Sequence, residues 1–277
     1  MLADGGYQVG ELAKCFYPTG VEISSPNNEE AEAQTLEWLK QDKVVVFEPA
    51  IRVRWYKLNM PTNSNDSCPY ILQSGHHSRL DLSRFSILHS EGQRLVKGWF
   101  DRAYELKDDY NESFEGFIFA WFAVNGWAAC VTSKDRDFEY IKLLGRSLEL
   151  REKFTTLLAT NTGFSLVANQ FHAFWPIFKA QDIRRAGHHG LNIKNRKEII
   201  DYYFKNGISS YEPDCWQFHQ SAGEEIPLDW PHTLQTIYRV RNNLFHGEKS
   251  AHSEMDQLIV KLAFQTLIRF FRGAEIL

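Results

Sequence analysis

Arg241 and His246 are the residues whose types and spacing best suit chemistry on a phosphate. They lie in the stretch RVRNNLFHGEKS, residues 239 to 250. A histidine titrates near neutrality and can move a proton to or from a hydroxyl. An arginine can hold a phosphate through paired hydrogen bonds and stabilise charge that develops in a transition state. The alternative interpretation is a structural arginine followed by a histidine that caps a helix.

One helix, from about Trp230 to His246, should carry both residues. Asp229 is a good N-cap, Pro231 is tolerated in the first turn, and Gly247 suits the left-handed position that follows a helix. The sequence therefore specifies both ends of this helix.

A helical projection separates an apolar arc from a polar one. The apolar arc holds Leu234, Ile237, Tyr238, Val240, Leu244 and Phe245. The polar arc holds Gln235, Arg239, Asn242, Asn243 and His246, and Arg239 needs no further explanation there. Arg241 falls inside the apolar arc, where an unpaired charge is costly, so we expect it to face a partner chain, an anion or a buried acid.

A single copy of this helix does not easily bring Arg241 and His246 to one phosphate. Five positions separate them, which is about 140° around the helix axis. Two copies related by a two-fold axis can each supply what the other lacks. The spacing therefore favours a site shared by two protomers.

The motif resembles the R-x4-6-H motif of the HEPN superfamily. Its residues are Arg241-Asn242-Asn243-Leu244-Phe245-His246, and the longer wording VRNNLFHGEKS looks like a form common among bacterial HEPN proteins. The segment FIFAWFAVNGWAA (117 to 129) is similar to an upstream helix of that group, with Trp121 and Asn125 four residues apart. The resemblance covers roughly residues 94 to 277.

The resemblance implies a helical, usually dimeric domain that cuts RNA without a metal. Attack by the ribose 2′-hydroxyl would leave a 2′,3′-cyclic phosphate and a 5′-hydroxyl, with Arg241 and His246 as catalytic residues and Asn242 orienting the phosphate. Asn125 would support the motif helix, or else it is a satisfied buried asparagine that ties two helices together. Such an enzyme would suit a toxin or a phage-defence component.

A basic segment, KAQDIRRAGHHGLNIKNRK (179 to 197), is the best candidate for contact with an RNA backbone. It has six basic residues against one acidic residue, in a chain whose formal net charge is −4. The alternative is a solvated helix-loop-helix face. The candidate RNA-binding residues are Arg184, Arg185, Lys194, Arg196 and Lys197, together with Arg239 and Lys249 from the motif region.

The predicted fold class is mainly α, a helical HEPN-like bundle preceded by a small α/β region. Residues 1–93 would form the mixed region, because VVVFEPAIRVRWYKL (44 to 58) alternates like a half-buried strand. Residues 94–277 would form the helical domain. Its candidate helices cover 94–109, 113–131, 137–160, 164–180, 193–206, 230–246 and 254–272.

No cofactor, metal or membrane contact is expected. The sequence has no Walker-type glycine loop, GxSxG elbow or GxGxxG after a strand. Cys215 and His219, four residues apart, could ligate one metal but lack clear companions. The most apolar segment, 117 to 131, is too short for a bilayer that needs roughly 20 residues. With no secretory signal and no CxxC pair, we expect a cytoplasmic protein.

Two other functions remain open. One is a non-catalytic HEPN-like module that binds RNA, a nucleotide or a partner protein. The other is a toxin-like protein whose acidic N-terminal region docks an inhibitor or antitoxin protein, or covers its own basic surface. A strict monomer would undercut the site shared by two protomers, whereas a dimer without nuclease activity would favour the binding module.

Overall fold

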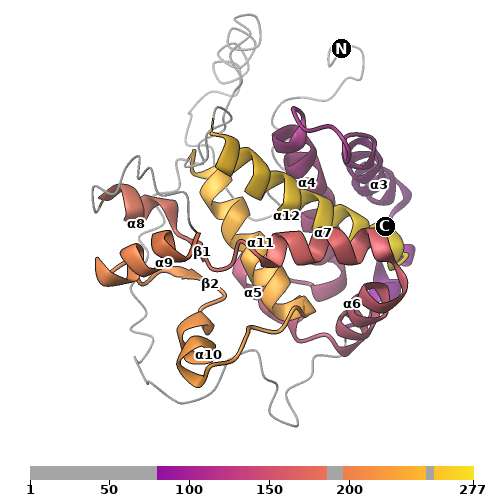
Figure 1. Cartoon of the computed structure of the whole chain (residues 1–277). Helices are drawn as coiled ribbons and strands as arrows, with labels where there is room; N and C mark the ends of the chain where they lie inside the picture. The colour runs from indigo at the N-terminus through magenta and orange to yellow at the C-terminus, as the bar shows by residue number, and fades with distance from the viewer. Residues whose placement is uncertain (1–79, 186–195, 248–252) are drawn as a thin grey trace, which may run out of the picture. The chain divides into compact units, whose positions relative to one another are not determined.

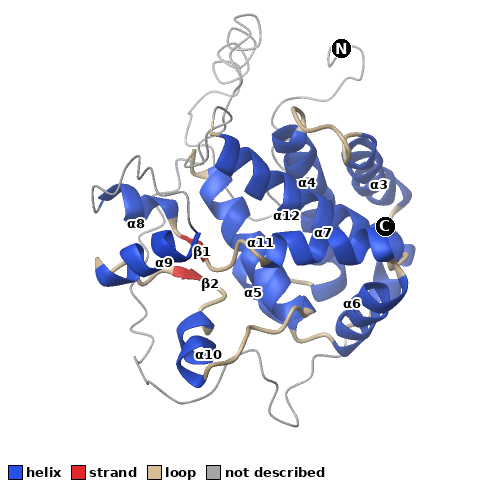
Figure 2. Cartoon of the chain, in the orientation of Figure 1, coloured by secondary structure: helices blue, strands red, loops and turns tan. Residues whose placement is uncertain are grey.

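Helices make up most of the chain that the structure describes. A computed structural model describes residues 80–185, 196–247 and 253–277, and these are mainly helical (Figures 1 and 2). The mainly α fold class is therefore confirmed. The elements are a 3-10 helix η1 (Leu82–Ile87), α3 (Ser90–Glu105), α4 (Ser113–Thr132), α5 (Asp137–Gly145), α6 (Leu148–Thr160), α7 (Thr162–His172), β1 (Ile177–Phe178), α8 (Ala180–Arg185), α9 (Arg196–Lys205), β2 (Tyr211–Glu212), α10 (Trp216–Ala222), α11 (Trp230–Phe245) and α12 (Glu254–Gly273).

Large aromatic side chains fill the core of the bundle. Trp121 and Trp127 of α4 are almost completely buried, and the ring of Trp230 lies 4.4 Å from that of Phe270 between α11 and α12. Trp230 also donates its indole N–H to the carbonyl of Leu144 at 2.9 Å. This bond satisfies the polar atom of a buried tryptophan and links α11 to α5.

α4 is longer than the sequence suggested. It spans 20 residues, and by length and composition alone it could cross a membrane, with half of its most apolar window buried inside the fold. The expectation that this segment is too short for a bilayer was therefore wrong. Its alanines at 120, 123 and 128 are fully buried, which suits close packing against neighbouring helices.

Two long predicted helices are broken in the structure. The segment 137–160 divides into α5 and α6 because Ser147 accepts a hydrogen bond from the amide of Leu150 and so caps a new helix. The segment 164–180 ends at His172, ahead of Pro176, whose preceding residue is disfavoured in helical conformation. Both breaks are caused by local backbone preferences. The apolar pattern continues across each break and therefore does not reveal it.

A small lobe lies beside the bundle. We call the described residues from Ile177 to Glu212 the β1–β2 lobe. Its two strands are antiparallel, with Ile177 opposite Glu212 and Phe178 opposite Tyr211. It has its own small core of Phe178, Ile200, Ile208 and Tyr211. Figure 1 shows α8, α9 and both strands grouped on one side of the bundle.

The predicted N-terminal α/β region lies mostly outside the described residues. The described part of it, 80–93, contains η1 and the first turn of α3. The boundary expected near residue 93 falls inside α3, and all the described residues belong to one unit, Asp66–Leu277. The organisation of residues 1–79 stays a prediction.

Gly116 should not tolerate a larger side chain. A Cβ at this position in α4 would lie 2.5 Å from Cε1 of Phe264, a ring that is itself fully buried. We expect Gly116→Ala to lower the free energy of unfolding by about 1 to 3 kcal/mol, because overpacking displaces that ring. Urea denaturation measures this change.

Gly98 is the matched control. It lies on the exposed face of α3, and a Cβ there would meet nothing within 4 Å. Gly98→Ala should raise stability by about 0.5 to 1 kcal/mol through helix propensity alone. Equal effects from the two substitutions would contradict the packing argument.

Candidate functional site

The motif helix α11 is buried on more sides than a single projection predicts. Leu234, Ile237 and Val240 are fully buried, which confirms the centre of the apolar arc. Asn243, assigned to the polar arc, is only 1% exposed, so that assignment was wrong. The physical reason is the β1–β2 lobe, which covers a face of α11 that would otherwise meet solvent.

Arg241 faces an acid of its own chain, one of the three partners expected for it. Its Nη2 lies 2.8 Å from the Asp137 carboxylate at the start of α5, and its Nη1 donates to the Asn242 side-chain oxygen at 3.0 Å. The guanidinium also lies 4.6 Å from the ring centre of Phe245 and 5.4 Å from that of Trp121. The side chain remains 20% exposed, so solvent reaches part of it.

Two tyrosines border this ion pair. Burial, followed by the negative charge of Asp137, raises the pKa of Tyr140 well above its ordinary value, and the same two causes raise the pKa of Tyr238. Both phenols therefore remain protonated at neutral pH. The hydroxyl of Tyr140 donates to the side-chain oxygen of Asn125, so Asn125 ties α4 to α5. Asn125 is only partly buried, and this contact does not involve α11.

His246 lies at the end of α11 and is exposed. Its backbone amide donates to Asn242 at 3.1 Å and closes the last turn, after which Gly247 takes a positive φ of 66°. The next carbonyl, that of Gly247, accepts a hydrogen bond from Arg184 of α8 at 3.2 Å. The structure thus brings one of the predicted RNA-binding arginines beside the histidine.

Asn243 has a structural role that the sequence did not reveal. Its Nδ2 donates to the carbonyl of Phe178 at 2.8 Å, and its Oδ1 accepts from the amide of Ala180 at 3.2 Å. One side chain therefore satisfies the backbone at the end of β1 and the start of α8. It joins the lobe that carries Arg184 to the helix that carries His246.

Arg239 makes an ion pair with the β1–β2 lobe. Its Nη2 lies 3.2 Å from the carboxylate of Glu212 in β2, and both side chains are 17% exposed. The expectation that Arg239 needs no explanation was therefore wrong, because a strand of the lobe reaches that side of α11. This ion pair is a second link between the lobe and the motif helix.

The basic segment divides into exposed and buried residues. Arg184 and Arg185 are exposed at the end of α8, and Lys197 is exposed in the first turn of α9. Arg196 instead donates to the backbone carbonyls of Phe174 and Pro176, and burial lowers its pKa to about 10. Arg196 thus supports the chain just before β1. Lys194 and Lys249 lie outside the described residues.

Cys215 and His219 do have a companion. His232, in the first turn of α11, brings a third donor to them, and all three residues are buried. The expectation that Cys215 and His219 lack clear companions was therefore wrong. The loop between α10 and α11 folds back on itself, which residue spacing alone does not reveal. Neither ring nitrogen of His219 makes a hydrogen bond with the residues that the structure describes, a state that typically costs about 1 to 3 kcal/mol.

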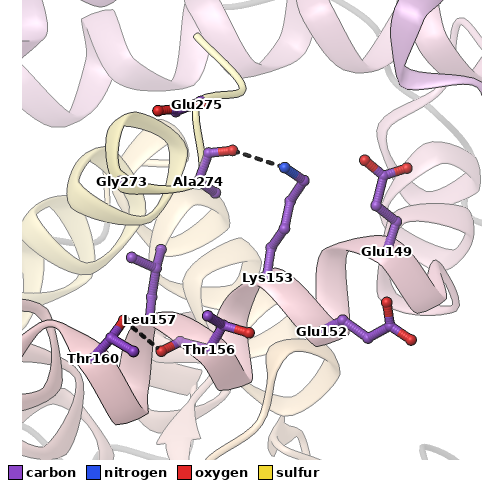
Figure 3. Close-up of a pocket in the computed structure, with 9 residues that line it drawn as sticks. All are labelled: Glu149, Glu152, Lys153, Thr156, Leu157, Thr160, Gly273, Ala274 and Glu275. Atoms are coloured by element: carbon purple, nitrogen blue, oxygen red, sulfur yellow. Dashed lines mark hydrogen bonds between the residues drawn. The ribbon is translucent and has the colours of Figure 1, made fainter.

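A surface depression lies away from the motif helix, between α6 and the end of α12 (Figure 3). Lys153 reaches across it and donates to the carbonyl of Ala274 at 3.0 Å. Three carboxylates, those of Glu149, Glu152 and Glu275, line it. This excess of negative charge is unsuited to a phosphate, so we leave the depression out of the candidate site.

Asn243→Ala should destabilise the fold. The substitution removes the partners of one buried carbonyl and one amide, and we expect a loss of about 2 to 3 kcal/mol in the free energy of unfolding. Chemical denaturation is the measurement. Asn242→Ala, at the partly exposed neighbouring position, is the control and should cost less than half as much. An equal loss in both variants would contradict the role of Asn243 as a joint.

Comparisons with known proteins identify no relative. No family model matches the chain, and no curated protein or solved structure shows a significant match. The likeness to the HEPN superfamily therefore rests on the motif and the upstream helix. The functional argument depends on the geometry around α11.

Proposed function

We propose that this protein is a metal-independent endoribonuclease whose active site is shared by two protomers. One observation carries the proposal: α11 holds a partly exposed arginine in a fixed position and ends in an exposed histidine beside a basic helix. Arg241 is held by Asp137, and His246 lies next to the carbonyl bound by Arg184. These groups are the ones that in-line transfer within RNA requires.

The reaction is an internal displacement at phosphorus. The ribose 2′-oxygen forms a bond to phosphorus as the bond to the 5′-oxygen breaks, which leaves a 2′,3′-cyclic phosphate and a 5′-hydroxyl. His246 moves a proton, either from the 2′-hydroxyl or to the leaving 5′-oxygen. Arg241 donates hydrogen bonds to the phosphate oxygens as negative charge develops on them.

Arg241 can serve a phosphate without leaving Asp137. Each terminal nitrogen of a guanidinium carries two N–H groups, and the contacts with Asp137 and Asn242 use one on each nitrogen. The second N–H of each is the donor that we assign to the substrate. Asp137 is then a positioning residue, which the sequence did not single out.

A two-fold dimer would bring Arg241 and His246 together although they point in different directions from one helix. His246 continues the last turn of α11, so it remains about 140° around the axis from Arg241. In the proposed dimer, Arg241 of one protomer and His246 of the other meet at the same phosphate. The partners implied are therefore RNA and a second copy of this chain.

One observation favours the alternative, a non-catalytic module that binds RNA, a nucleotide or a partner protein. The ion pair with Asp137 and the aromatic contacts supply a structural reason for Arg241 that needs no substrate. A dimer that binds RNA without cutting it would support this alternative.

Purified full-length protein should cleave RNA when EDTA is added together with the substrate. His246→Ala and Arg241→Ala should each reduce the rate by about 10²- to 10⁴-fold, since each removes a group that acts in the transition state. Gel analysis with end-group identification should find 2′,3′-cyclic phosphates, and a 2′-deoxy substitution at the cleaved nucleotide should block the reaction.

The matched controls lie on α3. His89 is an exposed histidine at a helix end, and Arg94 is an exposed arginine paired with Glu91. His89→Ala and Arg94→Ala should leave the rate within about twofold, because neither touches the proposed site. Full cleavage by either motif variant, with its fold intact, would refute the catalytic assignment.

Mixing two inactive variants tests the shared site. In a mixed dimer of Arg241→Ala and His246→Ala, one of the two sites regains an intact arginine and an intact histidine. After subunits exchange in an equal mixture, about a quarter of the wild-type rate should return. No recovery, with exchange verified by mass-tagged subunits, would mean that each site is built within one protomer.

A further inference from the structure

Cys215, His219 and His232 form a cluster of metal-ligand type at the end of α11 opposite to His246. Cys215 precedes α10, His219 lies within α10, and His232 lies in the first turn of α11. Their exposed fractions are 4%, 4% and 1%. One donor atom from each lies within 4.8 Å of the other two.

The imidazole of His219 is the least explained group of the cluster. Neither of its nitrogens makes a hydrogen bond with the described residues. A carboxylate oxygen of Glu224 lies 3.5 Å from Nδ1, and that carboxylate is mostly exposed. A buried imidazole without a hydrogen bond requires an explanation, and a bound metal ion would provide one.

His232 is already arranged as a metal ligand. Its Nδ1 lies 2.6 Å from the carboxylate of Asp229, a distance that suits an Nδ1–H donating to that carboxylate and so favours the tautomer in which Nε2 is the ligating nitrogen. A carboxylate behind a histidine in this way orients the ring and raises its basicity in many zinc sites. The same carboxylate caps α11 by accepting the backbone amide of His232 at 3.1 Å.

We propose that Cys215, His219 and His232 bind a zinc ion, with Asp229 supporting His232. A thiolate and two neutral imidazoles are the donors that zinc prefers over magnesium, calcium or manganese. Ligands about 2.0 to 2.3 Å from zinc lie roughly 3.4 to 3.7 Å from one another, so shifts of about 1 Å bring these donors to coordination distance. Water takes the fourth tetrahedral position.

The zinc ion would act by holding α10 against α11. α10 has only 7 residues, too few to be stable as an isolated helix. His232 and His246 are fourteen positions apart on one helix, or about 21 Å. The zinc is therefore remote from the proposed cleavage site, and the two proposals stand or fall separately.

The first test is metal content and cobalt spectroscopy on the full-length protein. Protein expressed with zinc should carry one zinc per chain, with no magnesium or manganese. After exchange, cobalt(II) should show a thiolate charge-transfer band and the intense visible absorption of tetrahedral coordination. Cys215→Ser should abolish the charge-transfer band, whereas Cys130→Ser, at the other described cysteine, should leave it unchanged.

The second test separates coordination from folding. Asp229→Asn keeps a side chain that caps helices as well as aspartate does, but it removes the negative charge behind His232. Zinc affinity, measured by competition with a chromophoric chelator, should fall about 10- to 100-fold. The melting temperature of the metal-free protein should change little.

Three outcomes would overturn the proposal. The first is wild-type protein that neither contains zinc nor takes up zinc or cobalt. The second is a charge-transfer band that persists in Cys215→Ser. The third is zinc affinity that is unchanged in Asp229→Asn. None of these measurements uses ribonuclease activity, so they test the zinc proposal whether or not the protein cleaves RNA.

Discussion

The burial of α11 on several faces makes each of its polar side chains costly unless that side chain finds a partner inside the fold. His232, Thr233, Thr236 and Asn243 are all 1% exposed or less, although they point in different directions from one helix. An unpaired polar group in such a place costs about 1 to 3 kcal/mol. Asn243 meets this cost with the backbone of the β1–β2 lobe, His232 bonds the cap residue Asp229, and Thr236 bonds the carbonyl of His232 in its own helix. The hydroxyl of Thr233 has no hydrogen bond with the described residues. The contacts of Asn243 therefore mark the position where another element must approach α11.

The β1–β2 lobe illustrates how one helix positions a neighbour. Asn243 binds the backbone at Phe178 and Ala180, while Arg239 pairs with Glu212. A strand and the start of α8 are thus attached to α11 four residues apart on the motif. Since α8 carries Arg184 and Arg185, the same contacts bring positive charge to the end of the helix where His246 lies. The structural asparagine and the candidate histidine belong to one arrangement.

The ion pair between Arg241 and Asp137 supports both interpretations of the motif. For catalysis it fixes the guanidinium before substrate arrives, so less entropy is lost when a phosphate binds. For a purely structural role it already compensates the charge of an arginine in apolar surroundings. Which of the two interpretations holds depends on whether a phosphate can bind the Arg241 guanidinium while Asp137 stays bound to it. Arginine is better suited to this than lysine, because its N–H groups point in several fixed directions.

The sequence predicts features that depend on neighbouring residues and fails where distant segments decide. The caps at Asp229 and Gly247 correctly placed α11 to within one residue. The break at Ser147 was missed because the apolar pattern continues through it. Asn243 was assigned to the polar face because a helical projection of α11 alone does not show that the β1–β2 lobe covers that face. His232 was missed as a candidate metal ligand because it lies thirteen positions after His219, which is itself part of a short helix that the sequence did not predict.

The path of the chain from β2 to α11 connects the two proposals physically. Glu212 contacts Arg239, and seven residues later His219 meets His232, seven residues earlier on α11. The segment from β2 through α10 therefore runs antiparallel along the motif helix, attached at both ends. Arg239 is two residues from Arg241, so β2 contacts α11 between the proposed zinc ligands and the proposed catalytic residues. The two proposed sites therefore share the scaffold of α11 and β2, while the proposed proton transfers involve His246 alone and no zinc ligand.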